Sequence, residues 1–373
     1  MKPFCNFQKP KYLCLALVTL FSLNAAAQEE INWIEFPDPA FEVNGLPWYE
    51  ENKPDLFRLP KRVEPLVREA VWKLGKSPSG ARIRFKSDCT TLGICIKYPR
   101  LSGMSNMHVF GQSGVDLYVD GRYTATAIHH KEVEVEQILF KTTIPKLREF
   151  VFYLPLYNGV EIQNIGVNPD AVIQSPRPFS IPKPVVFYGT SITQGGCASR
   201  SGMSYQAILG RILNIDFVNL GFSGNGKGEK EVAETIAEID ASCFVMDFMA
   251  NNRSAEGLAK VYEPFLRIIR AQHPETPIIA ITRIYAIRGN SLSFNENSEA
   301  KRDVVRAAVA KLQEEGDKNL ILVEGYDLLG PDLADGLVDG SHPNDLGFQA
   351  MADRLAPTLA QVLNLHQPRT LTQ

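Results

Sequence analysis

Several residues with catalytic side chains occur where hydrophobic segments of the sequence end. Ser191 follows the apolar run "PVVFYG", and Asn251 and Asn252 follow "CFVMDFMA". Asp339 and His342 stand three residues apart in "VDGSHPND", beyond the apolar run "NLILVE". A histidine can take the proton of a serine hydroxyl, and a carboxylate can orient that histidine and stabilise its charged form. The combination is suited to acyl transfer through a serine nucleophile.

A glycine-rich segment supplies what this chemistry still needs. The stretch "NLGFSGNGKG" has four glycines in ten residues, so its backbone N–H groups can turn toward a cavity without obstruction by Cβ atoms. The negative oxygen of a tetrahedral intermediate needs preorganised donors, and glycine N–H groups together with an asparagine side chain can provide them. The sequence therefore predicts an oxyanion site beside the serine.

The spacing of apolar residues predicts the elements that position these side chains. We expect strands at 185–188, 216–220, 243–249, 277–282 and 319–324, and helices at 204–213, 230–239, 262–272, 300–313 and from 345 onward. Nearly all-apolar strands that alternate with amphipathic helices form a parallel sheet covered on both faces, an α/β fold. Such sheets bind ligands at the carboxyl ends of their strands, where the candidate residues lie.

Elimination also selects one histidine. Of the six in the chain, only His342 follows a strand of the predicted parallel sheet; the others are His108, His129, His130, His273 and His366.

The N-terminal half has a different period. Short runs with two-residue alternation between about residues 65 and 172, without a convincing helix, predict an antiparallel β-sandwich of jelly-roll type, and Asp120-Gly121 predicts a two-residue hairpin turn. Four prolines in "QSPRPFSIPKPVV" mark the boundary. We expect a sandwich domain at 28–175 and a catalytic domain at 183–367, packed together because the connector is short and stiff.

The first residues have the pattern of a secretory signal peptide. Three lysines precede an apolar run from Tyr12 to Leu23, and small residues end at Ala27. We expect residues 1–27 to be removed and the mature protein to be periplasmic or extracellular, without stable membrane insertion; a retained anchor is the alternative. Positive and negative side chains are interleaved at a net charge of −3, which leaves no basic surface for nucleic acid.

Four cysteines remain in the expected mature chain: Cys89, Cys95, Cys197 and Cys243. A disulfide between Cys89 and Cys95 is one option in an oxidising compartment. The other is that Cys89 and Cys243 are buried, free side chains in strands. No paired CxxC clusters point to zinc.

The order of these motifs resembles the SGNH, or GDSL-like, hydrolase family, whose four blocks carry Ser, Gly, Asn and His. The matching segments are "GTSITQGG", "GFSGNG", "DFMANN" and "DGSHP". The resemblance implies Ser191 as nucleophile, with Asp339 and His342 as its partners, on an SGNH-type, flavodoxin-like sheet. It further implies Gly224 and Asn251 as oxyanion donors.

The N-terminal half adds to the resemblance, and two positions depart from it. "GVDLY" at 114–118 is similar to the GxDLY signature of a domain that precedes one SGNH subgroup. Thr190 stands where the family usually has aspartate, which matters little to mechanism if that residue serves loop structure. Asn252 follows Asn251 where many members have aspartate, so Asn252 is the alternative donor. The sequence around Ser191 does not match the G-x-S-x-G nucleophile elbow of α/β-hydrolases, because Thr193 stands where that motif has its second glycine.

Three further features have two interpretations each. "IHHKEVEVE" at 128–136 could bind a metal, but alternating glutamates are typical of the solvated face of a strand. Cys197, close to the nucleophile, is expected to be a small packing residue rather than a reactive thiol. Residues 114–118 are expected to form a hairpin with a buried tyrosine rather than a sugar platform. No metal ion and no organic cofactor is expected.

The sequence therefore predicts an exported serine esterase that acts on a small-molecule or polysaccharide ester, with acetyl groups on carbohydrate as the expected substrate. The alternatives are a lipid acylhydrolase or thioesterase of the same family, and a carbohydrate-binding protein with an inert hydrolase domain. The oligomeric state is not predicted.

Overall fold

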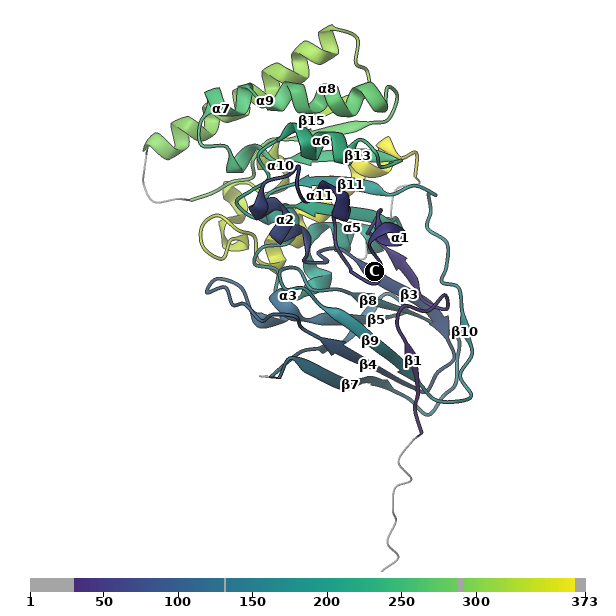
Figure 1. Ribbon diagram of the computed structural model, residues 1–373. Helices are drawn as coiled ribbons and strands as arrows, with labels where there is room; N and C mark the ends of the chain where they lie inside the picture. Colours follow the sequence, from purple (N-terminus) through teal and green to yellow (C-terminus); the bar gives the residue numbers. More distant parts are fainter. Residues whose placement is uncertain (1–29, 131, 288–291, 366–373) are drawn as a thin grey trace, which may run out of the picture. The chain divides into compact units, whose positions relative to one another are not determined.

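The computed structural model describes residues 30–130, 132–287 and 292–365 (Figure 1). The predicted signal segment, 1–27, lies outside the described residues. All elements below belong to one compact unit that begins at Ile31. No helix in the described part of the chain combines the length and apolar content needed to cross a bilayer.

Two antiparallel sheets form the N-terminal half, as expected for a β-sandwich. One has the strand order β1-β9-β4-β7, and the other β10-β3-β8-β5-β6 with β2 paired to β3. The strands are β1 (Asn32–Glu35), β2 (Glu42–Asn44), β3 (Arg82–Ser87), β4 (Thr91–Lys97), β5 (Val115–Val119), β6 (Arg122–Ala127), β7 (Glu134–Lys141), β8 (Arg148–Tyr153), β9 (Glu161–Val167) and β10 (Ile173–Gln174). The predicted turn between β5 and β6 is confirmed, since Asp120 and Gly121 both have positive φ, 49° and 78°.

A five-stranded parallel sheet with the order β12-β11-β13-β14-β15 forms the C-terminal half, which confirms the α/β fold. Its strands are β11 (Val185–Gly189), β12 (Phe217–Gly221), β13 (Cys243–Asp247), β14 (Ile278–Ile281) and β15 (Leu320–Val323). Its helices are α4 (Ser191–Gln194), α5 (Tyr205–Leu213), α6 (Lys230–Ile236), α7 (Ala255–Ala259), α8 (Tyr262–Gln272), α9 (Leu292–Glu314), α10 (Gly325–Leu328) and α11 (Asp345–Val362), with 3-10 turns η2 (Ser201–Met203), η3 (Met249–Asn251) and η4 (Pro331–Gly336).

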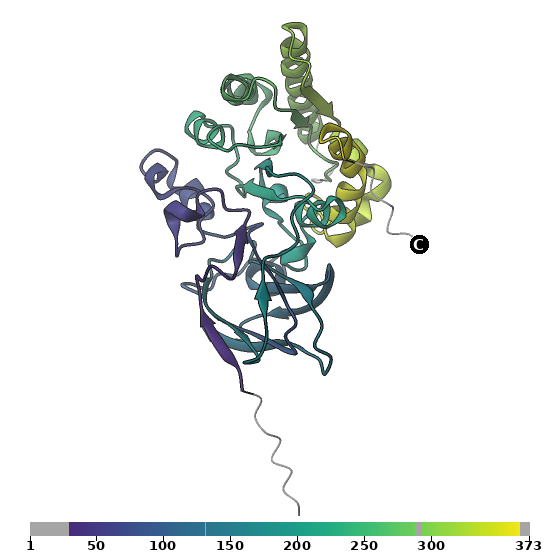
Figure 2. The ribbon, with the colours of Figure 1, turned by 90° about the vertical axis from the view of Figure 1, so that its right-hand side faces the viewer.

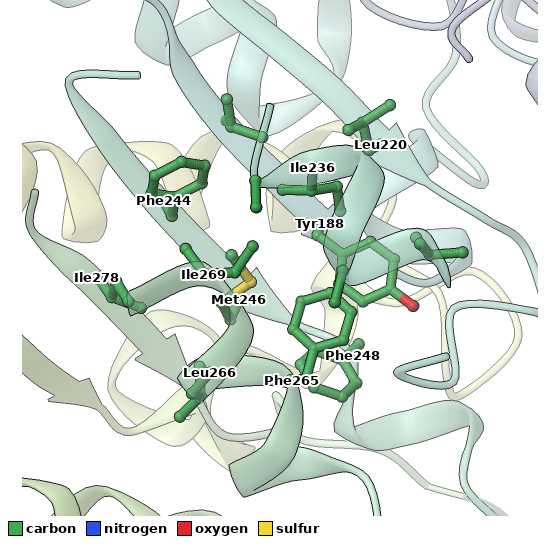
Figure 3. Close-up of a cluster of buried hydrophobic side chains, with 14 of the residues drawn as sticks. Tyr188, Leu220, Ile236, Phe244, Met246, Phe248, Phe265, Leu266, Ile269 and Ile278 are labelled. Atoms are coloured by element: carbon green, nitrogen blue, oxygen red, sulfur yellow. The ribbon is translucent and has the colours of Figure 1, made fainter. Parts of the chain in front are cut away.

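Both faces of the parallel sheet are buried, as the apolar strands predict. Helices lie on both faces of the sheet (Figure 2). In β11, Val186 and Tyr188 pack with α6, α8 and α9, whereas Val185 and Phe187 pack with α5 and α11. On the first face the Tyr188 ring stacks on Phe265 at 4.7 Å between centroids, and its hydroxyl lies at the edge of the cluster (Figure 3). That hydroxyl accepts a hydrogen bond from the N–H of Gly228 at 2.9 Å, so the core is connected to the glycine-rich loop.

The expectation of no convincing helix between about residues 65 and 172 was wrong, because α2 (Glu69–Gly75) and α3 (Val109–Ser113) lie in that range. Before it, the N-terminal half also holds α1 (Tyr49–Asn52) and η1 (Lys61–Val63). The segment around η1 and α2 buries Leu59, Val71 and Trp72 in the core cluster of the parallel sheet and not in that of the sandwich. Its apolar residues therefore follow no two-residue alternation, because they do not belong to a strand of the sandwich.

The four cysteines among the described residues are free. Cys89 and Cys95 form no disulfide, and Cys89 is buried in the turn between β3 and β4 instead of in a strand, which corrects that part of the expectation. Cys243 is buried in β13, as expected.

Candidate active site

Ser191, His342 and Asp339 form one chain of hydrogen bonds. Ser191 Oγ lies 2.9 Å from His342 Nε2, and His342 Nδ1 lies 2.8 Å from Asp339 Oδ2. An ionised carboxylate can only accept, so Nδ1 carries the proton and leaves the lone pair of Nε2 directed at the serine hydroxyl. The arrangement can therefore remove the hydroxyl proton of Ser191 during attack on an ester.

The loop of Asp339 fixes the carboxylate from several sides. Its Oδ1 accepts the backbone N–H groups of Ser341 at 3.0 Å and His342 at 2.9 Å. Its Oδ2 also accepts from the side-chain amide of Asn106 at 2.9 Å. Burial raises the pKa of the Asp339 carboxyl, but the hydrogen bonds from Asn106 and His342 outweigh it, and the net pKa is lowered. Asp339 thus stays ionised well into the acidic range.

The cap of α4 holds the serine at the end of β11. Thr190 is the N-cap: its hydroxyl accepts from the N–H of Ile192, and its own N–H donates to Thr193 Oγ1 at 3.3 Å. Thr193 Oγ1 in turn donates to the buried Asp247 Oδ2 at 3.3 Å. Threonine in place of the usual aspartate therefore serves loop structure here.

The glycine-rich loop after β12 lies directly against the end of β11. A Cβ on Gly226 would lie 1.9 Å from the carbonyl oxygen of Gly189, so no larger residue fits at 226. Gly224, two residues earlier, is exposed and has φ of +68°, and no atom lies within 4 Å of where its Cβ would be. Its backbone therefore borders open space.

The side chain of Asn251 is bound to the same loop. Its carboxamide is satisfied when Oδ1 accepts from the N–H groups of Asn225 at 3.0 Å and Gly226 at 3.1 Å, which turns Nδ2 to the opposite side. Asn252 instead places Nδ2 3.4 Å from the carbonyl of Lys227, and its own carbonyl accepts from Lys301 Nζ at 3.0 Å. Of the two asparagines, Asn251 is the one whose side-chain oxygen accepts two backbone N–H groups of the glycine loop, whereas Asn252 makes a single longer contact with it.

Residues of the N-terminal half hold this loop and the serine in place, and sequence reasoning missed all of them. Arg68 donates to the side-chain and backbone oxygens of Asn225 at 2.8 and 2.9 Å. The buried Arg58 donates to the carbonyl of Gly221 at 2.7 Å, where β12 ends. Tyr157 lies with its hydroxyl 3.4 Å from the carbonyl of Ser191. None of these belongs to a recognisable motif, so the sequence offered no signal for them.

Cys197 lies beside the dyad of Asp339 and His342. Each of the three side chains has one atom that could bind a metal ion, and these three atoms lie within 4.8 Å of one another. No other group of three or more such side chains occurs among the described residues. Burial, with the charge of Asp339, raises the pKa of the Cys197 thiol to about 12. The thiol is therefore protonated at neutral pH, which agrees with a packing residue more than with a nucleophile. The segment around His129 and His130 is not part of this grouping, and Glu134 and Glu136 of β7 face solvent.

The GxDLY segment connects the two halves. Asp116 is fully buried and accepts from Thr126 Oγ1 at 2.6 Å, from the N–H of Gly202 at 2.8 Å and from Arg200 Nη1 at 3.1 Å. Tyr118 is buried, as expected, and its hydroxyl accepts from Arg200 at 2.5 Å. Gly202 and Arg200 belong to the loop that follows α4, so this hairpin supports the region next to the serine.

Comparisons with known proteins agree with this geometry. Residues 182–360 match the GDSL-like lipase/acylhydrolase family, and residues 31–173 match the GxDLY family, described as the N-terminus of SGNH-hydrolase-type esterases. No curated protein matches the chain.

Solved structures include close and remote relatives. A protein from Bacteroides ovatus ATCC 8483, described as a GDSL-like lipase, shares 32% identity at a TM-score of 0.83, with 91% of this chain and 100% of that chain covered. A salicylyl-acyltransferase of a tetracycline biosynthetic pathway shares 19% identity (TM-score 0.77; 91% and 99% covered). An acetyl xylan esterase from the rumen bacterium Butyrivibrio proteoclasticus shares 14% (TM-score 0.61; 90% and 99% covered), which shows the fold alone. The chain belongs to the GDSL-like, or SGNH, hydrolase family and carries the GxDLY type of N-terminal domain.

Proposed function

We propose that this protein is an exported serine esterase that removes short acyl groups, acetyl above all, from carbohydrate hydroxyls. The observation that carries the proposal is the hydrogen-bonded chain from Ser191 Oγ through His342 to Asp339, with 2.9 and 2.8 Å between the paired atoms. The family is one of ester hydrolases, and this chain retains every residue type that the reaction needs.

The reaction follows from the protonation states. Ser191 Oγ attacks the ester carbonyl carbon while its proton passes to His342 Nε2, and Asp339 stabilises the imidazolium. The oxyanion accepts hydrogen bonds from the N–H groups of Ser191 and Gly224 and from Asn251 Nδ2. The intermediate collapses, the C–O bond to the sugar breaks, and His342 returns the proton to the leaving hydroxyl. Water then attacks the acyl-serine by the same route, which releases the free acid and restores the serine.

Support for a short acyl group on a sugar comes from two sides. The loops that carry the candidate residues are small and polar, "SGNGKG" and "DGSHPND" among them, and do not supply the extended apolar surface that a long chain needs. One of the solved structures with this fold is described as an acetyl xylan esterase. That likeness is an analogy of fold and enters as such.

The test is a substrate series. The purified protein is assayed with p-nitrophenyl esters from acetate to decanoate and with acetylated xylan, pectin and monosaccharides. We expect kcat/KM to peak at about two to four acyl carbons and free acetate to be released from a sugar. A peak at about eight carbons or more would favour the lipid function, and transfer of the acyl group to an added alcohol in preference to water would make the protein an acyltransferase.

The inert-domain alternative has its own test. A fluorophosphonate probe should label the wild-type protein and fail to label Ser191→Ala. Absence of labelling in both would support a binding protein without catalysis.

Export rests on the N-terminal pattern alone. In a native-type host we expect the secreted protein to begin at Gln28, so an intact mass that retains the first 27 residues would contradict it.

A further inference from the structure

A cavity lies between the β-sandwich and the amino ends of the parallel strands. Its volume is about 260 Å³, and its walls come from β3, β5 and β8 on one side and from the end of α5 and the start of β12 on the other. None of the five candidate catalytic residues lines it. The volume is close to the lower end of ligand pockets, roughly 300–1,000 Å³, and suits a single sugar ring.

The lining is rich in positive charge. Four arginines face the cavity, Arg82, Arg84, Arg177 and Arg211, against the carboxylates of Asp120 and Glu149. Two of the four have acidic partners: Arg82 pairs with Asp216 behind the wall, and Arg84 pairs with Glu149 at 3.1 Å.

The other two arginines, Arg177 and Arg211, have guanidinium N–H groups that are not used in hydrogen bonds within the part of the protein that the structure describes. Arg211 donates through Nη1 to the carbonyl of Gly202 at 2.8 Å and stacks on the ring of Tyr118 at 4.5 Å. Arg177 donates through Nη2 to Asn214 Oδ1 at 2.9 Å. Across the described ranges neither forms an ion pair with a carboxylate. Because a guanidinium has five N–H donors, both can still bind an anion in the cavity.

We propose that this cavity binds the carboxylate of an acidic sugar, a uronic acid unit, through Arg177 and Arg211. The guanidinium fork matches a planar carboxylate and gives paired, charge-assisted hydrogen bonds. Tyr153 and Phe179 give the wall apolar surface for the ring, and Asp120 and Glu149 offer acceptors for sugar hydroxyls. These two acids also repel a single group that carries two negative charges, such as phosphate, more strongly than the one carboxylate of a uronic acid unit. The choice of a sugar rests on the proposed function, whereas the preference for a carboxylate does not.

The experiment measures binding directly by calorimetry on the full mature chain. The probes are digalacturonate, the neutral disaccharide xylobiose, acetate and inorganic phosphate. The variants are Arg177→Gln and Arg211→Gln, with Arg354→Gln on the exposed surface of α11 as the matched control. We expect digalacturonate to bind the wild type and the control, and to bind each cavity variant at least about tenfold more weakly. Xylobiose should bind far more weakly than digalacturonate.

Several outcomes would overturn the inference. They are unchanged digalacturonate binding in both cavity variants, equal binding of xylobiose, binding of phosphate or acetate as tight as that of digalacturonate, or no binding at all. Arg177 is exposed, so Arg177→Gln tests the site even if Arg211→Gln fails to fold. Hydrolysis of p-nitrophenyl acetate, measured in parallel, should be unchanged in the cavity variants. A failure of the esterase assay in the wild type would count against the proposed function and not against this cavity.

Discussion

The two halves of the protein contribute to the candidate site in different ways. In the parallel-sheet half, each candidate residue lies in a short motif beyond a strand: Ser191 after β11, Gly224 after β12, Asn251 after β13 and His342 beyond β15. In the N-terminal half, single residues reach the site from loops and short helices, as Asn106 does when it donates to Asp339. The difference indicates a division of roles, in which one half performs the chemistry and the other positions it.

The division predicts that the largest losses of activity come from the parallel-sheet half. Ser191→Ala or His342→Ala should lower kcat for a simple acetate ester by on the order of 10³ or more, because neither nucleophile nor base is replaced. The check is steady-state kinetics together with thermal melting, which should change little. Near-normal activity of Ser191→Ala would mean that the site has been assigned wrongly.

The oxyanion donor comes next. Asn251→Ala should lower kcat by about 10²–10³, the usual cost of one lost donor, with little change in Tm. Asn252→Ala is the matched control, because its side chain makes only one long contact with the loop, 3.4 Å to the carbonyl of Lys227, and it should keep most of the activity. If Asn252→Ala shows the larger loss, the donor is one residue further along the chain.

A residue of the N-terminal half should have a smaller effect of a different kind. Asn106→Ala removes one donor from Asp339 and should lower kcat by about tenfold, since the other donors remain. The lost hydrogen bond lets the pKa of Asp339 rise toward its usual value, so Asp339 takes up a proton at higher pH. The acid limb of the pH–rate profile should therefore move to higher pH.

The control is Ser105→Ala, an exposed neighbour on the same loop. It should leave both kcat and the pH profile unchanged. If Asn106→Ala keeps the wild-type pH–rate profile, the N-terminal half has no role in positioning the catalytic carboxylate.

The smallest expected effect concerns stability. Burial raises the pKa of Asp247 to about 7, whereas an unfolded aspartate titrates near 3.9. Between these values the folded state holds more protons than the unfolded state, so the free energy of unfolding falls as pH rises from about 4 to 7. Asp247→Asn should remove this slope, and the difference in Tm between pH 5 and pH 8 should shrink by about 4 °C or less. An unchanged slope in scanning calorimetry would show that Asp247 is already ionised when folded.

Much of the fold could be predicted because its signals are local. Period and length of the apolar runs located the parallel strands, and helix α8 spans 262–272 as predicted. The short helix α2 was not predicted, because its apolar residues pack into the core of the parallel-sheet half. They therefore show neither the two-residue alternation of sandwich strands nor the all-apolar runs of parallel strands.

The sequence by itself determined which residue types stand at the carboxyl ends of the strands and therefore which chemistry is available. Tertiary structure decided what holds them. Asn106 and Asp339 are 233 residues apart, and Arg68 and Asn225 are 157 apart. Contacts of this kind depend on how separate segments pack. A single asparagine or arginine in a loop belongs to no periodic pattern or motif, so its partner cannot be predicted from the sequence. The same holds for the arginine-lined cavity, whose walls come from both halves and exist only once these halves are packed together.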